Sequence, residues 1–191
     1  WEGFDTATQA AAAGGICTVV DMPLNCQPVT TTPAALQTKI ESTQNQLWVD
    51  MGFWGGVVPG NANQLVPLAD AGVLGAKAFL IHSGIDDFPA SSESDLREAM
   101  TELAQAGIPL LAHAELDLGS PESVFPPDQY RSYLASRPPQ WEVEAIELLI
   151  RLSRETGCAV HIVHLSAADA IPALRQARAE RLPITVETCP H

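Results

Sequence analysis

The run Gly75-Ala76-Lys77-Ala78-Phe79-Leu80 is a strand-like segment with a single lysine inside an otherwise apolar stretch. Two later strand-like runs each carry a histidine near their end: Leu110-Leu111-Ala112-His113 and Val160-His161-Ile162-Val163-His164. A charged lysine rarely occupies an apolar strand unless it is paired or has a function there. A metal site is the interpretation that uses all three segments.

Helix-like segments separate these runs and continue in both directions along the chain. Gly107 ends one amphipathic helix and Gly157 ends another. A strand and a helix together take roughly 25 to 35 residues, which is the length of a βα unit. We predict strands over 16–22, 47–58, 73–81, 108–113, 159–165 and 184–188, and helices over 6–13, 32–43, 61–71, 94–106, 142–156 and 167–181.

This alternation predicts an α/β fold with a parallel sheet. An open doubly wound sheet would also fit, but no GxGxxG or GxxxxGKS phosphate loop follows any predicted strand. No linker divides the chain, so we expect one domain over 1–191, an incomplete (β/α)8 TIM-type barrel of about six βα units. The chain opens at Trp1 without a methionine and closes at His191 directly after a strand pattern, so we expect an internal fragment.

Composition narrows the classes of function. The formal net charge is −13 and only ten residues are Lys or Arg, which argues against nucleic-acid binding. No apolar run approaches the roughly 18 residues of a membrane span, and no signal sequence opens the chain. The cysteines Cys17, Cys26, Cys158 and Cys189 show no CxxC spacing and are expected to be reduced thiols. We therefore expect a cytoplasmic protein whose partners are small molecules or protein subunits.

Residues at the carboxyl ends of barrel strands perform the chemistry of such folds. His113, His164 and His191 fall at these ends, and Lys77 lies slightly deeper. Side chains alternate between the two faces of a strand, so His161 and His164 are expected to point in opposite directions. We assign His164 to the barrel interior because it is nearer the strand end, and His161 to the face that packs against the outer helices.

Structural explanations remain open for each of these residues. A single histidine at a strand end is more often a hydrogen-bonded structural residue than a ligand. Lys77 taken alone would most often extend its amine to the surface. Glu115 is either a hydrogen-bond partner of His113 or a loop charge. The coincidence of a lysine and two histidines on successive strands favours the metal site.

Motifs along nearly the whole chain resemble the cyclic amidohydrolase branch of the amidohydrolase superfamily. Two loops, Pro23-Leu24-Asn25 and Ser83 to Pro89, are most similar to the allantoinase family, whereas dihydroorotases and hydantoinases share the rest. The shared motifs are Gly14-Gly15-Ile16 through Asp21-Met22, Gly75 to Leu80, Ala112-His113-Ala114-Glu115, Ser136-Arg137-Pro138 with Glu142 and Glu144-Ala145-Ile146, His161 with His164-Leu165-Ser166, and Cys189-Pro190-His191.

The resemblance implies two divalent metal ions, usually zinc, bridged by a carboxylated Lys77. His113 and His164 would bind the more exposed metal. Burial favours the neutral amine of a lysine, and its reaction with carbon dioxide yields an anion that can span two cations. From their places at strand ends, we expect Asn25, Ser83, Gly84 and His191 to line the substrate site.

The implied reaction is ring opening of a cyclic ureide, allantoin to allantoate, by an enzyme that forms a homo-oligomer, a dimer or a tetramer, when intact. Dihydroorotase and hydantoinase or dihydropyrimidinase activity are alternatives, as is a non-catalytic assembly protein. A His-x-His ligand pair expected before Trp1 and an aspartate ligand expected after His191 are absent from the sequence. We therefore expect 1–191 alone neither to close a barrel nor to turn over substrate.

Overall fold

Strands and helices alternate along the part of the chain that the computed structural model describes, residues 2–119, 126 and 128–190. The strands are β1 (Thr18–Asp21), β2 (Asp50–Phe53), β3 (Gly55–Gly56), β4 (Ala76–Phe79), β5 (Leu110–His113), β6 (Val160–Ile162) and β7 (Ile184–Val186). The helices are α1 (Gly3–Ala13), α2 (Pro33–Ser42), α3 (Leu65–Asp70), α4 (Glu93–Ala106), α5 (Tyr130–Ser136), α6 (Pro139–Thr156) and α7 (Ile171–Ala179), with short 3-10 turns η1 (Ala62–Gln64) and η2 (Ala168–Ala170).

All paired strands are parallel, as predicted. β1 pairs with β2, and β3 to β7 form a second sheet in sequence order. The two sheets meet at Trp54, whose N–H donates to the carbonyl of Asp21 at 2.9 Å, while the N–H of Gly55 donates to the carbonyl of Gly75 at 2.8 Å. The strand predicted over 47–58 is therefore two short strands that join the sheets.

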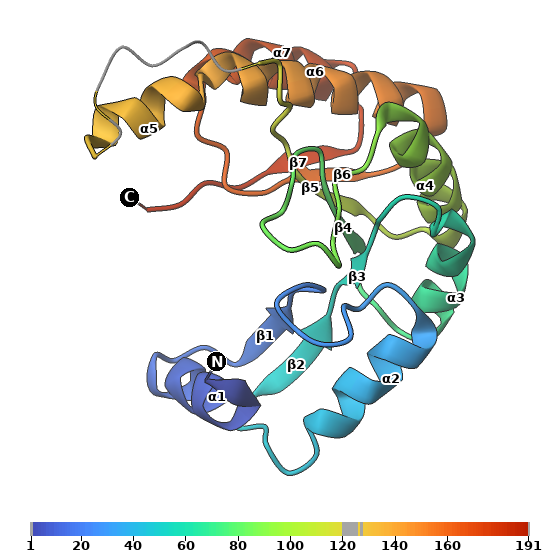
Figure 1. Cartoon of the computed structure of the whole chain (residues 1–191). Helices are drawn as coiled ribbons and strands as arrows, with labels where there is room; N and C mark the ends of the chain where they lie inside the picture. The colour runs from blue at the N-terminus through green and yellow to red at the C-terminus, as the bar shows by residue number, and fades with distance from the viewer. Residues whose placement is uncertain (1, 120–125, 127, 191) are drawn as a thin grey trace.

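The strands follow one another in an arc, with α2, α3, α4, α6 and α7 along its outer side (Figure 1). β1 and β7 stand at the two ends of the arc, and among the described strands they are not hydrogen-bonded to each other. This is the winding of a (β/α)8 barrel, in agreement with the predicted fold class.

Local signals in the sequence explain where the helices begin and end. Thr32 caps α2 by accepting a hydrogen bond from the N–H of Ala35, and a proline occupies the first helical position. α4 begins at Glu93 because Ser92 and Asp95 form a capping box. Both α4 and α6 end at a glycine in the left-handed conformation, as the sequence predicted.

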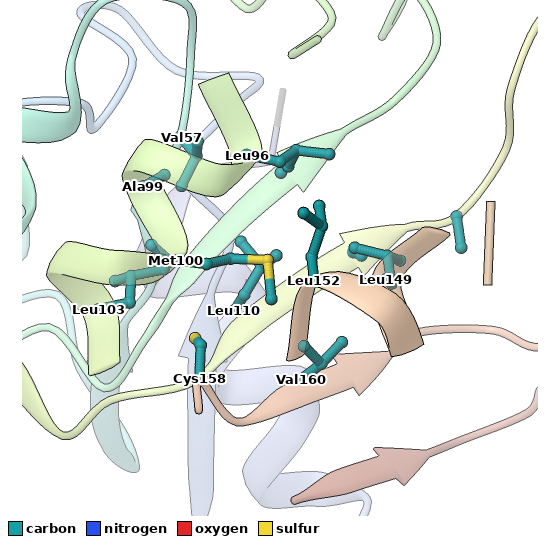
Figure 2. Packing of buried hydrophobic residues seen from close by; sticks show 14 of the residues in the cluster. Val57, Leu96, Ala99, Met100, Leu103, Leu110, Leu149, Leu152, Cys158 and Val160 are labelled. Carbon is teal, nitrogen blue, oxygen red and sulfur yellow. The ribbon is translucent and has the colours of Figure 1, made fainter. Parts of the chain in front are cut away.

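The core lies between the sheet and the two long helices α4 and α6 (Figure 2). Alternate strand residues point outward into it and are small or branched, which lets the helices approach closely. Leu103 of α4 and Leu149 of α6 are completely buried there. The strand residues of this cluster are Ala76, Ala78, Leu110, Ala112, Val160 and Ile162, and the partly buried Ile184 packs against it.

The segment between β5 and α6 departs from the predicted pattern. The segment 115–139, for which the sequence predicted neither a strand nor a helix, contains helix α5. The thiols of Cys17, Cys26, Cys158 and Cys189 are free, and only that of Cys158 is fully buried. Across the described helices, none is both long enough and apolar enough to cross a lipid bilayer.

Candidate functional site

One row of residues crosses the sheet on the concave side of the arc. Gly56 pairs with Lys77, Lys77 with Leu111, Leu111 with His161, and His161 with Thr185. Residues paired in this way point to the same face of a parallel sheet. Their neighbours along the strands enter the core beneath the helices, so this row faces the barrel interior.

The prediction that His161 packs against the outer helices is wrong. Its Nδ1 lies 2.7 Å from Oγ1 of Thr185, and its Nε2 lies 3.4 Å from Oε2 of Glu187, both on the concave side. β6 ends at Ile162, and His164 adopts a φ of 44°, so strict alternation does not continue between the two histidines. Both imidazoles therefore reach the barrel interior.

Lys77 is buried, with 4% of the residue exposed. Burial lowers the pKa of its amine to about 8, although the negative charge of Glu187 acts in the opposite direction. The Nζ atom lies 4.4 Å from the centre of the Phe79 ring. A lysine with this pKa is a neutral amine for about half of the time at pH 8.

His113 and His164 approach each other at the ends of β5 and β6. Nδ1 of His113 lies 3.1 Å from Nε2 of His164, and Phe79 stacks on the His113 ring with 4.7 Å between ring centres. Burial lowers the pKa of His113 and favours the neutral imidazole that binds metals. Two imidazole nitrogens on one tetrahedral zinc would be about 3.4 Å apart, since each zinc–nitrogen bond is about 2.0–2.1 Å long. The pair fits a shared cation.

Glu115 lies between His113 and the guanidinium group of Arg137 and contacts both. Its Oε2 lies 2.9 Å from Nε2 of His113, and its Oε1 accepts a hydrogen bond from Nη1 of Arg137 at 2.6 Å. Burial raises the pKa of Glu115, but the hydrogen bonds from His113 and Arg137 lower it by more, so the net shift is downward. A carboxylate at this position favours the tautomer with the proton on Nε2, which leaves the Nδ1 lone pair free to bind a metal. The sequence left this role of Glu115 open.

A pocket of about 500 Å³ lies in front of the two histidines. Its wall combines the imidazoles and Glu115 with apolar surface from α5 and the start of α6, so a small, partly polar ring would fit it. The lining residues are His113, Ala114, Glu115, Leu134, Arg137, Pro138, Pro139, Glu142, His164, Ser166 and Ala167.

The residues predicted to contact substrate lie on other loops. Asn25 follows β1 with a φ of 60°, and Ser83 and Gly84 follow β4. None of these three lines the pocket beside the histidines. The hydroxyl of Ser83 is hydrogen-bonded within its own loop, to Ile85. His191 lies outside the described residues.

Several residues near the site were not predicted as functional. Phe79 lies two positions after Lys77 and Glu187 two after Thr185, so the period of two in a strand could have placed both on the concave face. Arg137 belongs to one of the shared motifs, but nothing in the sequence indicated its contact with Glu115, which is 22 residues away.

Within the described residues, no three His, Cys, Asp or Glu side chains form a group that could hold a metal.

The whole chain is similar to allantoinases of distant organisms. It is 45% identical to the allantoinase of Saccharomyces cerevisiae over 197 aligned residues, which cover 100% of this chain and 43% of the relative. It is 47% identical over 194 residues to the allantoinase of Streptomyces avermitilis, again with 100% and 43% covered. The mitochondrial allantoinase of Aquarana catesbeiana is 45% identical over 192 residues, with 100% and 40% covered. The chain thus spans less than half the length of these relatives.

The chain is also similar to solved structures of hydantoinases and dihydropyrimidinases. An L-hydantoinase (dihydropyrimidinase) from Arthrobacter aurescens matches with a TM-score of 0.88 and 31% identity, over 98% of this chain and 42% of that chain. A dihydropyrimidinase from Brevibacillus agri matches with a TM-score of 0.80 and 27% identity, with 98% and 42% covered. No family model matches the sequence.

Proposed function

We propose that this chain is part of an allantoinase, a cyclic amidohydrolase whose barrel domain extends beyond residues 1–191. The similarity to allantoinases over 100% of the chain, at 45% identity, is the observation that carries this proposal. The reaction would add water across a ring amide of allantoin. The C–N bond breaks, the carbonyl carbon gains a hydroxyl, and the ring nitrogen gains a proton, which yields allantoate.

The buried lysine and the two histidines would supply ligands to two divalent metal ions, with zinc as the expected element. The neutral amine of Lys77 would add carbon dioxide and release a proton, forming the bridging carbamate. His113 and His164 would offer Nδ1 and Nε2 to one cation, as their separation of 3.1 Å supports. Metal ions of this kind, when bound, polarise a carbonyl and lower the pKa of water.

The chain's own residues would orient the reacting groups. Glu115 would hold the tautomer of His113, with Arg137 fixing the carboxylate from the other side. Leu134 and Pro138 would cover the substrate ring and exclude bulk water from the pocket. We keep Asn25, Ser83, Gly84 and His191 as proposed substrate contacts, although the described pocket does not include the first three.

Hydantoin or dihydropyrimidine ring opening is a second candidate. It is favoured by the similarity to L-hydantoinase, with a TM-score of 0.88. All these substrates contain a cyclic amide, so the catalytic groups named above would serve each of them. The difference would lie in the loops that contact the ring substituents.

Turnover by the full-length protein tests these proposals. Allantoin, hydantoin, dihydrouracil and dihydroorotate are each supplied to zinc-loaded protein, and ring opening is followed by the release of the open-chain acid. We expect the highest kcat/KM for allantoin and no turnover by Lys77→Ala. A preference for hydantoin or dihydroorotate would replace the substrate assignment. Zinc-loaded protein that opens none of the four rings would favour a non-catalytic assembly protein.

The cytoplasmic location and the homo-oligomeric state stay predictions. One of the similar proteins is named as mitochondrial, so related enzymes are not confined to one compartment. Cell fractionation would test the location, and light scattering of the purified full-length protein would give the subunit number.

A further inference from the structure

Glu142, in the first turn of α6, reaches the backbone that follows β6. Its Oε1 accepts a hydrogen bond from the N–H of Ser166 at 2.9 Å, and its Oε2 accepts one from the N–H of Ala167 at 2.6 Å. One carboxylate thus binds two consecutive amides in a segment 24 and 25 residues away in sequence. Charge-assisted hydrogen bonds of this kind are stronger than those between neutral groups.

These two amides lie directly after the turn that contains His164. The φ of His164 is 44°, in the left-handed region that a side chain with a Cβ adopts only when its surroundings enforce it. The residue just after β7 holds the turn from one side, because the N–H of Leu165 donates to the carbonyl of Glu187 at 2.7 Å. Glu142 holds it from the other side.

The side chain of His164 has little else to orient it. It is exposed, and among the described residues its ring has one hydrogen-bond partner, His113. Its direction is therefore set chiefly by its backbone, and a small rotation of the turn would move Nε2 away from His113. The backbone in turn depends on the contacts at Leu165, Ser166 and Ala167.

We propose that Glu142 is a positioning residue for His164. By binding the backbone that follows the turn of His164, Glu142 keeps the Nε2 atom of His164 within reach of the metal ion that His113 also binds. This inference rests on the proposed function in one respect, that the imidazole pair holds a metal. The end of α5 and the start of α6 then position both histidines. Arg137 at the end of α5 fixes His113 through Glu115, and Glu142 in the first turn of α6 fixes the turn of His164.

Cobalt binding to the metal-free, full-length protein tests the role of Glu142. Co²⁺ is titrated into the wild type, Glu142→Ala and Glu142→Gln, and its visible absorption reports both affinity and ligand geometry. We expect Glu142→Ala to weaken binding by about 10–100-fold and to change the spectrum, as loss of a group that orients a metal ligand does. Glu142→Gln keeps one acceptor oxygen and should fall between. Glu147→Gln, an exposed glutamate on the same helix, is the matched control and should bind as the wild type does.

Amide hydrogen exchange in the metal-free proteins gives a second readout. Loss of the carboxylate should speed exchange at Ser166 and Ala167 while the amides of β5 stay protected, which separates a local release from general unfolding. If the wild type binds cobalt and both Glu142 variants bind it with the same affinity and spectrum, the role of Glu142 is refuted. The proposed function is not affected by that result. A wild type that binds no cobalt would remove the metal site of the proposed function, and this inference with it.

Discussion

Phe88 packs against the face of Gly56, at the place where any other residue would carry its side chain. A Cβ atom at Gly56 would lie 2.5 Å from Cε2 of Phe88 and 3.0 Å from Cγ2 of Thr31. Phe88 is completely buried, so its ring has no free space to move into. The loop after β4 thus closes over the sheet at Gly56, the neighbour of Lys77 in the row of paired residues.

Gly56→Ala should destabilise the protein because the added methyl group overpacks this contact. We expect the free energy of unfolding to fall by about 1–3 kcal/mol, measured by urea denaturation. Gly14→Ala is the control, since its Cβ would meet nothing closer than 3.4 Å, and it should change stability by no more than about 0.5 kcal/mol. Equal effects at the two positions would contradict the close packing.

Stability of the metal-free protein should rise with pH between about 8 and 10.5. Burial lowers the pKa of Lys77 from 10.5 to about 8, so within this window the unfolded chain binds the extra proton and the folded chain does not. Below pH 8 both states bind it, and the full cost of burying the ammonium is present. That cost is on the order of 3 kcal/mol.

Lys77→Met isolates this effect, because methionine fills similar space without a charge. Unfolding of wild type and variant is measured from pH 7 to 11 in buffer free of carbon dioxide. The variant should be more stable at pH 7, and the difference should shrink as pH rises towards 10.5. A difference that does not depend on pH would mean that the amine is not buried as described.

Glu115→Gln should lower the pKa of His113 still further. Burial already lowers this pKa, and the hydrogen bond with Glu115 is the main interaction that opposes the shift. Titration of the metal-free protein followed by NMR of the imidazole protons would measure the change. Glu144→Gln, whose partner Gln140 lies on the helix surface, should leave the pKa of His113 unaltered, and an upward shift in Glu115→Gln would refute the prediction.

The cysteines should differ sharply in reactivity. Burial raises the pKa of the Cys158 thiol to about 11, so almost none of it is the reactive thiolate at pH 8. Cys17 and Cys189 are exposed and should be alkylated by iodoacetamide within the native protein. Mass spectrometry of digested protein should find Cys158 labelled only after denaturant is added, and early labelling of Cys158 would show that the core beneath β5 and β6 opens.

Local signals made most of the fold predictable from the sequence. Glycines at 107 and 157 marked helix ends, and Thr32 marked a helix start, because these residues satisfy helix termini through contacts within a few positions. Helix α5 was missed because it lies in a stretch rich in Pro and Ser, and its tyrosines are exposed rather than arranged on a buried face. The break at Trp54 depends on hydrogen bonds to distant strands, which no local pattern records.

The candidate site was predictable in its members but less so in its geometry. Lys77 stood out because an ammonium in an apolar strand is costly. The face of His161 was assigned wrongly because the alternation was counted through His164, beyond the actual end of β6. The contacts of Arg137 and Glu142 join segments more than twenty residues apart, so they required the folded structure.

The order of the strands has a consequence for biosynthesis. In the sheet from β3 to β7, every strand after β3 pairs with the strand that precedes it in the chain. A nascent polypeptide can therefore add each new strand to an existing edge as it leaves the ribosome, without waiting for a partner still to be translated. The turn that carries His164 would be held by Glu142 once residue 167 has emerged, and by the carbonyl of Glu187 only after that residue follows.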